Sequence, residues 1–289
     1  MFERIGSSWQ LVKESWSVLQ QDRELLLFPL VSMLGTIVVM IVFAIPLFAS
    51  GLVQSFAAEG ETSMTQNVIG LVLLFIFYLV MYTVIIFSNT ALIGAAMMRL
   101  NGEDPTIRDG FRIASEHAGK IIGYAAISAT VGVILSMIRG DEDNILGQIV
   151  ASVISFAWNI VTFLVIPVLV IENVGPIDAI KRSGSLLRQT WGEQLVGSFS
   201  IGTIFGLITV AVIFLIGGPI MALVIATESV VLIIIGVAAV VLLVAAINLV
   251  GGALNGIFQA ALYKYATEGS TGDVFREDLV KGAFVPKTR

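Results

Sequence analysis

Six long apolar segments without a single charged residue or histidine constrain the fold of this chain more than any other feature. They run over residues 28–54, 67–98, 121–138, 147–171, 195–225 and 230–263. A helix rises about 1.5 Å per residue, so each segment is long enough to cross about 30 Å of hydrocarbon. The chain is 13% charged, against about 25% in an average soluble protein. We therefore predict an all-α, polytopic membrane bundle of six transmembrane helices, forming one integral membrane domain over residues 1–289.

The basic residues predict the orientation of this bundle. Fifteen of the 16 Lys and Arg residues precede the first segment, lie in an even-to-odd connection or lie in the tail, and only Arg139 lies on the other side. Basic residues concentrate in cytoplasmic loops, so we expect both termini in the cytoplasm and the protein in the cytoplasmic (inner) membrane, a cell membrane. The net charge of −5 lies in the external loops, and no basic patch points to nucleic acid.

An internal repeat follows each even-numbered segment. Glu103, Glu172 and Glu268 follow segments two, four and six, and each is followed by Asp, any residue, an apolar residue and a basic one. The three copies of this motif begin at Asp109, Asp178 and Asp273. We therefore predict three repeats of amphipathic helix, span and span, over about 1–103, 104–172 and 173–268, with a tail at 269–289.

Two similar nonapeptides lie in the helices expected before spans one and five. They read "SWQLVKESW" at residues 8–16 and "SGSLLRQTW" at residues 183–191. Apolar residues at spacings of three and four, with Trp and basic residues beside them, are typical of helices that lie at a membrane surface. The nonapeptides are thus read as scaffold, with a docking site as the alternative. The predicted interfacial anchors are Trp9, Trp16, Trp191, Lys13, Lys181, Arg182 and Arg188.

Polar residues at comparable depth in spans two, four and six form a candidate interior. They are Asn89, Thr90, Asn159, Asn248, Asn255 and Gln259. Such side chains either hydrogen-bond between packed helices or line a cavity for a solute or lipid headgroup, and both interpretations stay open.

Glycine pairs predict where two spans cross. Gly202 and Gly206 lie in span five, and Gly252 and Gly256 lie at matching depths in span six. Small residues let helix backbones approach closely in a membrane, so we expect spans five and six to cross at these four positions.

Most enzymatic and ion-coupled functions lack their residues here. The chain has no Cys and one His, so it carries no zinc motif and no Ser–His pair inside a span. No carboxylate lies inside a span, and such carboxylates usually mark pumps and symporters. We therefore predict no catalytic residue, no metal site and no cofactor.

Two stretches carry a resemblance to known sequences. They are "MFERIGSSWQLVKESWSVLQQDRELLLFPLVS" at the start and "VIPVLVIENVGPIDAIKRSGSLLRQTWG" at 165–192. Both resemble a prokaryotic family of six-span proteins known as a domain of unknown function. The second stretch is also similar to the membrane portion of some bacterial glycerophosphodiester phosphodiesterases. The resemblance implies no established activity and supplies no functional residues.

These observations favour a non-enzymatic multi-pass membrane protein that organises lipid or supports a membrane complex. The alternative is an uncoupled transporter or channel for a small solute or lipid, built on the polar interior. The expected partner is membrane lipid, and a membrane protein or a second copy of this chain stays open as a further partner.

Overall fold

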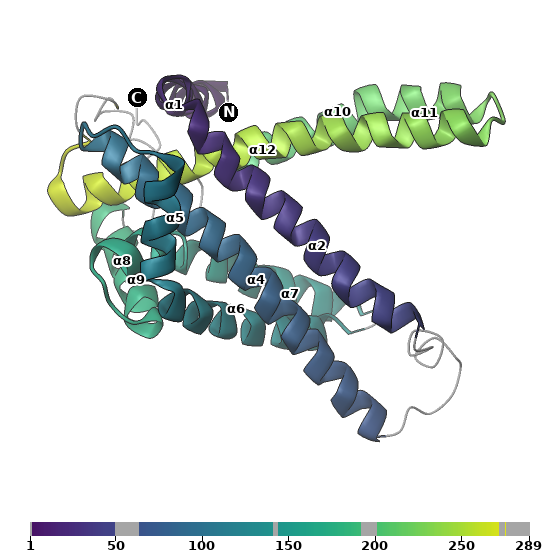
Figure 1. Cartoon of the computed structure of the whole chain (residues 1–289), viewed down its shortest axis with the longest axis horizontal. Coiled ribbons are helices and arrows are strands. Elements are labelled where there is room, and N and C mark those ends of the chain that lie inside the picture. Colours follow the sequence, from purple (N-terminus) through teal and green to yellow (C-terminus); the bar gives the residue numbers. More distant parts are fainter. Residues whose placement is uncertain (1, 50–63, 141–143, 192–200, 272–274, 276–289) are drawn as a thin grey trace.

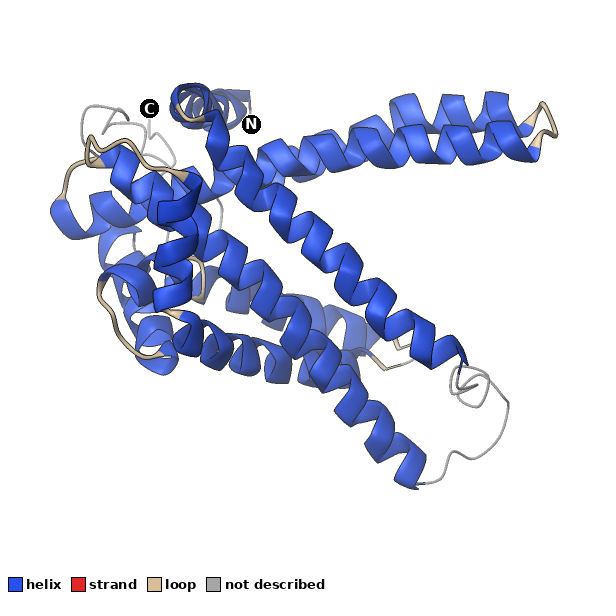
Figure 2. Ribbon diagram, viewed as in Figure 1, coloured by secondary structure: helices blue, strands red, loops and turns tan. Residues whose placement is uncertain are grey.

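The computed structural model describes residues 2–49, 64–140, 144–191, 201–271 and 275. Every regular element among these residues is a helix, as Figure 2 shows. Six helical stretches are long and apolar enough to cross a membrane, so the predicted all-α class and the six spans are confirmed. Most of the tail predicted at 269–289 lies outside the described residues.

Four spans contain one long helix each, and two are interrupted. The uninterrupted helices are α2 (Leu27–Ala49), α4 (Met64–Leu100), α6 (Ala118–Arg139) and α12 (Val230–Glu268). The interrupted spans are α7 (Ile145–Val161) with α8 (Val165–Ile171), and α10 (Ile201–Val212), the π-helical turn η3 (Ile213–Gly217) and α11 (Gly218–Ile225). The shorter helices are α1 (Phe2–Gln21), η1 (Arg23–Leu26), α5 (Ile107–Glu116) and α9 (Pro176–Trp191).

The spans form three hairpins that share one end of the molecule. The hairpins are α2 with α4, α6 with α7–α8, and α10–η3–α11 with α12. Figure 1 shows them leaving the same end and diverging toward the other. We call the shared end the compact end and the far ends of the hairpins the distal end. The distal end includes the turns at Asn144 and at Thr227–Ser229.

The core lies at the compact end, where α8 and the C-terminal halves of α4 and α12 meet. Small residues allow this close approach. A Cβ at Gly256 of α12 would clash with the side chain of Leu92 in α4. The fully or almost fully buried residues of this core are Ala91, Leu92, Ile93, Ala95, Ala96, Leu164, Val165, Val168, Leu169, Leu254, Ile257, Phe258, Ala260, Ala261 and Leu262.

Each amphipathic helix packs on the second span of a hairpin other than the one that it precedes in the chain. Helix α5 packs on α4, α9 packs on α8, and α1 packs on α12. Helices α1 and α9 bury equivalent positions of the two nonapeptides. Leu11 and Val12 of α1 are buried, and so are Leu186 and Leu187, which occupy the same two positions in α9. Together the three contacts form a closed ring, because the first amphipathic helix, α1, packs on the last span, α12.

The break in the fourth span is bridged by a serine of α9. The hydroxyl of Ser183 donates a hydrogen bond to the carbonyl of Val161 (2.6 Å) and accepts one from the amide of Leu164 (3.1 Å). These are backbone groups that the helix leaves unpaired where α7 ends and α8 begins. The nonapeptide serine therefore stabilises the interruption directly.

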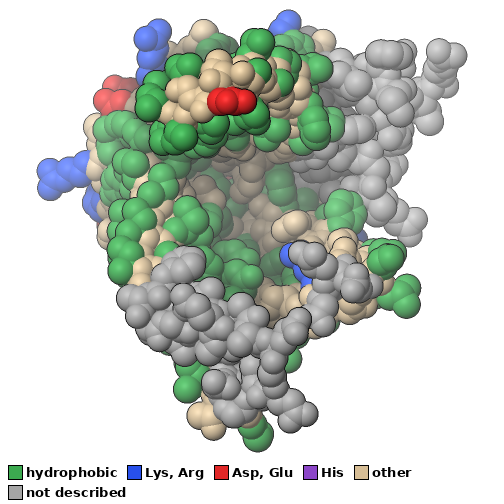
Figure 3. Space-filling view, turned by 90° about the vertical axis from the view of Figure 1, so that its right-hand side faces the viewer, with side chains coloured by type: hydrophobic (Ala, Val, Ile, Leu, Met, Phe, Trp, Pro, Cys, Tyr) green, Lys and Arg blue, Asp and Glu red, His purple; other side chains and the backbone are tan. Residues whose placement is uncertain are grey.

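The distal halves of the hairpins expose large apolar side chains. In α12 these include Val231, Ile234, Val241 and Leu242, each at least 59% exposed. Figure 3, which looks onto the distal end, shows a hollow with largely hydrophobic walls between the α10–α12 hairpin and the rest of the molecule. We call this space the hollow.

Candidate functional site

A cavity of about 240 Å³ lies between α4, α6 and α7. We call it the slot. All three helices contribute polar side chains to its wall, namely Tyr78, Tyr82, Ser128, Ser136, Ser155 and Asn159. The two from each helix are four or eight residues apart, a spacing that places them on one face of that helix. The helical repeat alone therefore gathers these polar groups along one wall.

Two tyrosines of α4 lie against α6 at the slot. A Cβ at Gly132 of α6 would lie 3.5 Å from the ring of Tyr78 and 3.5 Å from the hydroxyl of Tyr82, which is ordinary van der Waals contact. The two tyrosine rings stack on each other with centroids 5.9 Å apart. The Tyr82 hydroxyl thus lies close to α6, which carries two of the serines of the slot.

The slot extends from the distal end to about the middle of the spans. Its lining on α6 runs from Ser128 to Arg139, the last residue of that helix. Eleven residues correspond to about 16 Å of rise. One turn closer to the compact end, Tyr124 is almost fully buried, with its hydroxyl close to Ser128 and Thr162. Tyr124 therefore lies beyond the end of the slot lining that is nearer the compact end.

The polar groups of the slot can all donate hydrogen bonds, and most of them can also accept. Tyr and Ser hydroxyls and the amide of Asn159 do both, whereas the indole N–H of Trp158 only donates. The hydroxyl of Ser136 already donates to the carbonyl of Val133 (2.8 Å). Among the described residues, Arg139 is the one charged residue of the lining and no carboxylate pairs with it, while Asp141, Glu142 and Asp143 lie outside them. The described part of the lining therefore offers hydrogen-bond donors and one positive charge.

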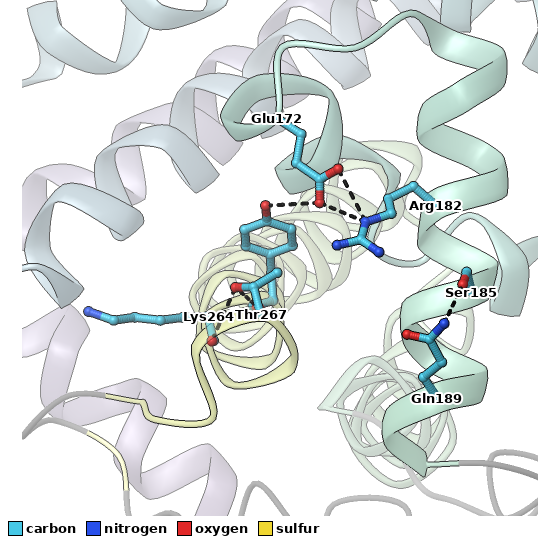
Figure 4. Close-up of polar contacts among 7 residues, drawn as sticks. Glu172, Arg182, Ser185, Gln189, Lys264 and Thr267 are labelled. Atoms are coloured by element: carbon cyan, nitrogen blue, oxygen red, sulfur yellow. Dashed lines mark hydrogen bonds and ion pairs between the residues drawn. The ribbon is translucent and has the colours of Figure 1, made fainter.

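A second set of polar contacts holds the compact end together (Figure 4). Glu172, at the end of α8, accepts hydrogen bonds from Arg182 Nε of α9 at 2.9 Å and from the hydroxyl of Tyr263 of α12 at 3.4 Å. The Glu172 carboxylate thus connects α8 of the second hairpin, α12 of the third hairpin and the amphipathic helix α9. Arg182 was predicted as an interfacial anchor, and the structure engages its guanidinium in this ion pair.

A buried lysine and a partly buried arginine join the ends of α4 and α12 to their neighbours. Lys264 is 8% exposed and donates to the carbonyl of Leu100 (2.9 Å) and to Asn101 Oδ1 (2.7 Å). Arg99 pairs with Asp22, which follows α1, and with Asp104. Both cations lie at the C-terminal end of α4, where they satisfy carbonyls or offset the negative end of the helix dipole.

The predicted polar interior does not form one site in the structure. Asn159 lines the slot and is exposed, while Asn248 is exposed on α12 and donates to the carbonyl of Val244. Thr90 is fully buried, and its hydroxyl has no hydrogen-bond partner among the described residues. The half-buried members of the set are Asn89, Asn255 and Gln259. No hydrogen bond within the described part of the chain joins any two of these six.

Helices α10 and α12 pack together as predicted, but at other glycines. The ring of Phe205 lies within 3 Å of a Cβ built at Gly251, and Val240 lies 3.2 Å from one built at Gly217. Gly206 faces open space and Gly202 is exposed. Gly252 approaches Pro29 of α2, whereas Gly256 approaches Leu92 of α4. The predicted small residues in span six therefore pack against α2 and α4 instead of α10.

The remaining predicted anchors lie on the surface. Trp9 and Trp16 are 48% and 42% exposed, and Lys13, Lys181 and Arg188 are also exposed. The side chain of Trp191 lies outside the described residues. The tryptophans of α1 therefore flank its buried face, which is formed by residues such as Leu11, Val18 and Leu19.

Sequence reasoning missed most of the slot. Tyr78, Tyr82, Ser128, Ser136, Arg139, Ser155 and Trp158 were not among the predicted residues. The available signal was the spacing of four that recurs in Tyr78–Tyr82, Ser128–Gly132–Ser136 and Ser155–Asn159. That signal requires knowing that α4, α6 and α7 are neighbours.

A family model describes most of the same chain. Residues 68–275 match the model of a family described as "Family of unknown function (DUF6159)". The chain belongs to this family. The match contains all of the slot and begins after the first of the two stretches that carry the resemblance. No match to the chain is found among curated proteins or among solved structures, so the similarity to glycerophosphodiester phosphodiesterases stays a prediction.

Proposed function

We propose that this member of the family is a non-enzymatic multi-pass protein of the cytoplasmic membrane that organises lipid. The observation that carries this proposal is the hollow between the diverging hairpins, whose walls are largely hydrophobic (Figure 3). Where hairpins diverge in a bilayer, the space between them must be filled by lipid, water or protein. Acyl chains suit these walls, because the distal half of α12 exposes Val, Ile and Leu on most sides.

In this proposal the compact end faces the cytoplasm, with both termini on that side. Fifteen of the 16 basic residues belong to segments that connect to the compact end. The ring of contacts made by α1, α5 and α9 supports the threefold repeat, because a repeat with closed packing explains why the first helix covers the last span. Repeats one, two and three then each supply one hairpin.

The amphipathic helices would hold the compact end at the headgroup layer. Trp9 and Trp16 remain exposed beside an otherwise buried face, as expected for rings at the interface between water and hydrocarbon. Lys13 and Arg188, at equivalent positions of the two nonapeptides, are both exposed and available to anionic headgroups. This supports the scaffold interpretation of the nonapeptides over a docking site.

Native mass spectrometry after extraction in a mild detergent tests the proposal. We expect a single chain carrying several phospholipids that resist exchange into detergent. The mass also distinguishes the other occupants of the hollow. A dimer without lipid, or a chain that retains no lipid at all, would contradict the proposal, and a stoichiometric second protein would make the chain a subunit of a complex.

The slot is the specific observation that favours the alternative, an uncoupled transporter or channel. A solute entering from the distal end would reach Tyr124, and passage would require this buried ring to move. Flux of a small solute into liposomes that increases on Tyr124→Ala would support transport. Equal flux through wild type and Tyr124→Ala, at the level of empty liposomes, would exclude it.

A further inference from the structure

We propose that the slot is a binding site for a phosphate group, carried by a phospholipid headgroup or by free phosphate. The lipid case rests on the proposed lipid-organising function, and the free-phosphate case does not. The described lining of the slot combines several neutral donors with one guanidinium, and no carboxylate is among these described residues. An anion with several oxygens can accept hydrogen bonds from such a set.

The cation lies at one end of the slot lining. Arg139 ends α6 at the distal end, and the residue is exposed. Guanidinium groups bind phosphate oxygens through two parallel hydrogen bonds. A phosphate would therefore meet the charge at the distal end and the hydroxyl of Tyr82 further inside, whereas the hydroxyl of Ser136 donates to the carbonyl of Val133 (2.8 Å).

Polar groups inside a span carry a cost. Tyr82 is half-buried, yet its hydroxyl lines a cavity and not a packed interface. Buried polar groups are costly unless they are hydrogen-bonded. A slot of about 240 Å³ has the volume of about eight water molecules at about 30 Å³ each. It has room for a phosphate group together with a small ester substituent.

A lipid could reach the slot from the membrane, since α4, α6 and α7 are all spans and α7 exposes Ile149, Val153 and Phe156 elsewhere on its surface. A phospholipid with its phosphate at Arg139 could leave its acyl chains against these apolar side chains. A single lipid would then occupy the slot and the surface of α7 at the same time.

The test compares three forms of the full-length protein: wild type, Arg139→Gln and the control Arg108→Gln. Arg108 is an exposed arginine on α5 at the compact end, so its variant makes the same charge change away from the slot. One arm counts phospholipids per chain by native mass spectrometry. The other measures binding of inorganic phosphate to delipidated protein by calorimetry, at constant ionic strength.

Loss of one phospholipid per chain in Arg139→Gln alone would assign the site to a lipid headgroup. Binding of inorganic phosphate that weakens about 10- to 100-fold in Arg139→Gln alone would assign it to free phosphate, since hydrogen bonds to charged groups contribute about 1.5–3 kcal/mol. Tyr82→Phe keeps the ring and removes one hydroxyl, and it should weaken the same binding about 3- to 10-fold.

If Arg139→Gln and Tyr82→Phe leave both the lipid count and phosphate binding unchanged, the inference is wrong. That result leaves the lipid-organising proposal intact when wild type still retains lipid. Conversely, wild type that retains no lipid but binds inorganic phosphate through Arg139 would contradict the proposed function and support the slot. Circular dichroism of each variant shows whether it is folded.

Discussion

The compact and distal ends of this molecule use the same helices in opposite ways. In α12 the C-terminal part, from Ala253 to Lys264, is largely buried among α1, α4 and α8. The N-terminal part, from Val230 to Leu243, contacts α11 and η3 along one stripe and exposes most of its other side chains. One helix therefore serves as protein core at one end and presents an exposed apolar surface at the other.

The residues at the two ends show why. The buried part contains Ala253, Ala260 and Ala261, with Gly256 between them, which permit close contact with α4. The exposed part is rich in Val, Ile and Leu, which are no more apolar than lipid tails and gain little from helix contact in a membrane. Small residues and buried polar contacts hold the compact end, and their scarcity leaves the distal end open to lipid.

Truncating one leucine at each end of α12 should give the largest difference. Leu254→Ala removes a side chain that is 1% exposed, and it should cost about 2–5 kcal/mol of stability because a cavity remains. Leu242→Ala removes one that is 70% exposed and should change stability by about 0.5 kcal/mol or less. Thermal unfolding in detergent measures both, and equal losses would mean that the distal half is packed in the functional protein.

Adding side chains to two glycines should give the next largest difference. Gly256→Val places a Cβ against Leu92, so we expect a loss of about 1–3 kcal/mol from overpacking. Gly206→Val makes the same change in α10, where a Cβ meets open space. The melting temperature should fall for the first variant only. A fall for Gly206→Val as well would indicate that this glycine packs against a neighbour in the membrane.

Removing a buried cation tests the polar contacts of the compact end. Lys264→Met leaves the carbonyl of Leu100 without its partner, which should cost about 1–3 kcal/mol. Lys181→Met is the matched control, because Lys181 is exposed and its nitrogen lies 3.9 Å from Asp178. Chemical denaturation of both variants gives the comparison. Two variants of equal stability would show that Lys264 does not hold α12 to α4.

The smallest predicted effect is a dependence on pH at the start of α5. Hydrogen bonds from the Thr106 hydroxyl (2.6 Å) and amide (3.1 Å) lower the pKa of Asp109 below its ordinary value of 3.8. This contribution to stability is present above the ordinary pKa and is lost as pH falls through the lowered one. Asp109→Asn should therefore reduce the loss of melting temperature on acidification below pH 4.

The equivalent position in the next repeat supplies the control for that experiment. Asp178→Asn changes an exposed carboxylate near Lys181. Its melting curve should respond to acid like that of wild type. If both variants or neither alters the acid response, the Thr106–Asp109 contact makes no measurable contribution.

The sequence predicts some parts of this structure well, for identifiable physical reasons. Long uncharged segments predict the six spans, because hydrocarbon excludes charge whatever the tertiary contacts. The nonapeptides predict amphipathic helices, and the positions Leu11 and Leu186 are both buried. These features depend on local sequence alone.

Other parts depend on which helices become neighbours, and local patterns do not contain that information. Gly256 was expected to face α10, but it faces Leu92 of α4 because the compact end joins α12 to α4. The group that stabilises the break between α7 and α8 is not predictable from local sequence, since Ser183 lies in another helix. Tyr78 and Ser128 become one site only once α4 and α6 are packed together.

The central claim is that lipid fills the space between the distal halves of the hairpins. The chain has no cysteine, so single cysteines can be introduced and spin-labelled along α12 without altering the background. Accessibility of each label to oxygen and to a water-soluble nickel chelate, measured in liposomes, tests the claim most directly. Labels at Ile234, Val237, Val241 and Leu242 sample the exposed faces, and Val240 samples the stripe that packs against Gly217.

The account predicts high oxygen and low chelate accessibility at all four exposed positions, and low accessibility to both reagents at Val240. A second protected face would contradict it by showing that protein covers α12 there. High chelate accessibility at the exposed positions would also contradict it, because the hollow would then contain water, as a channel or transporter requires.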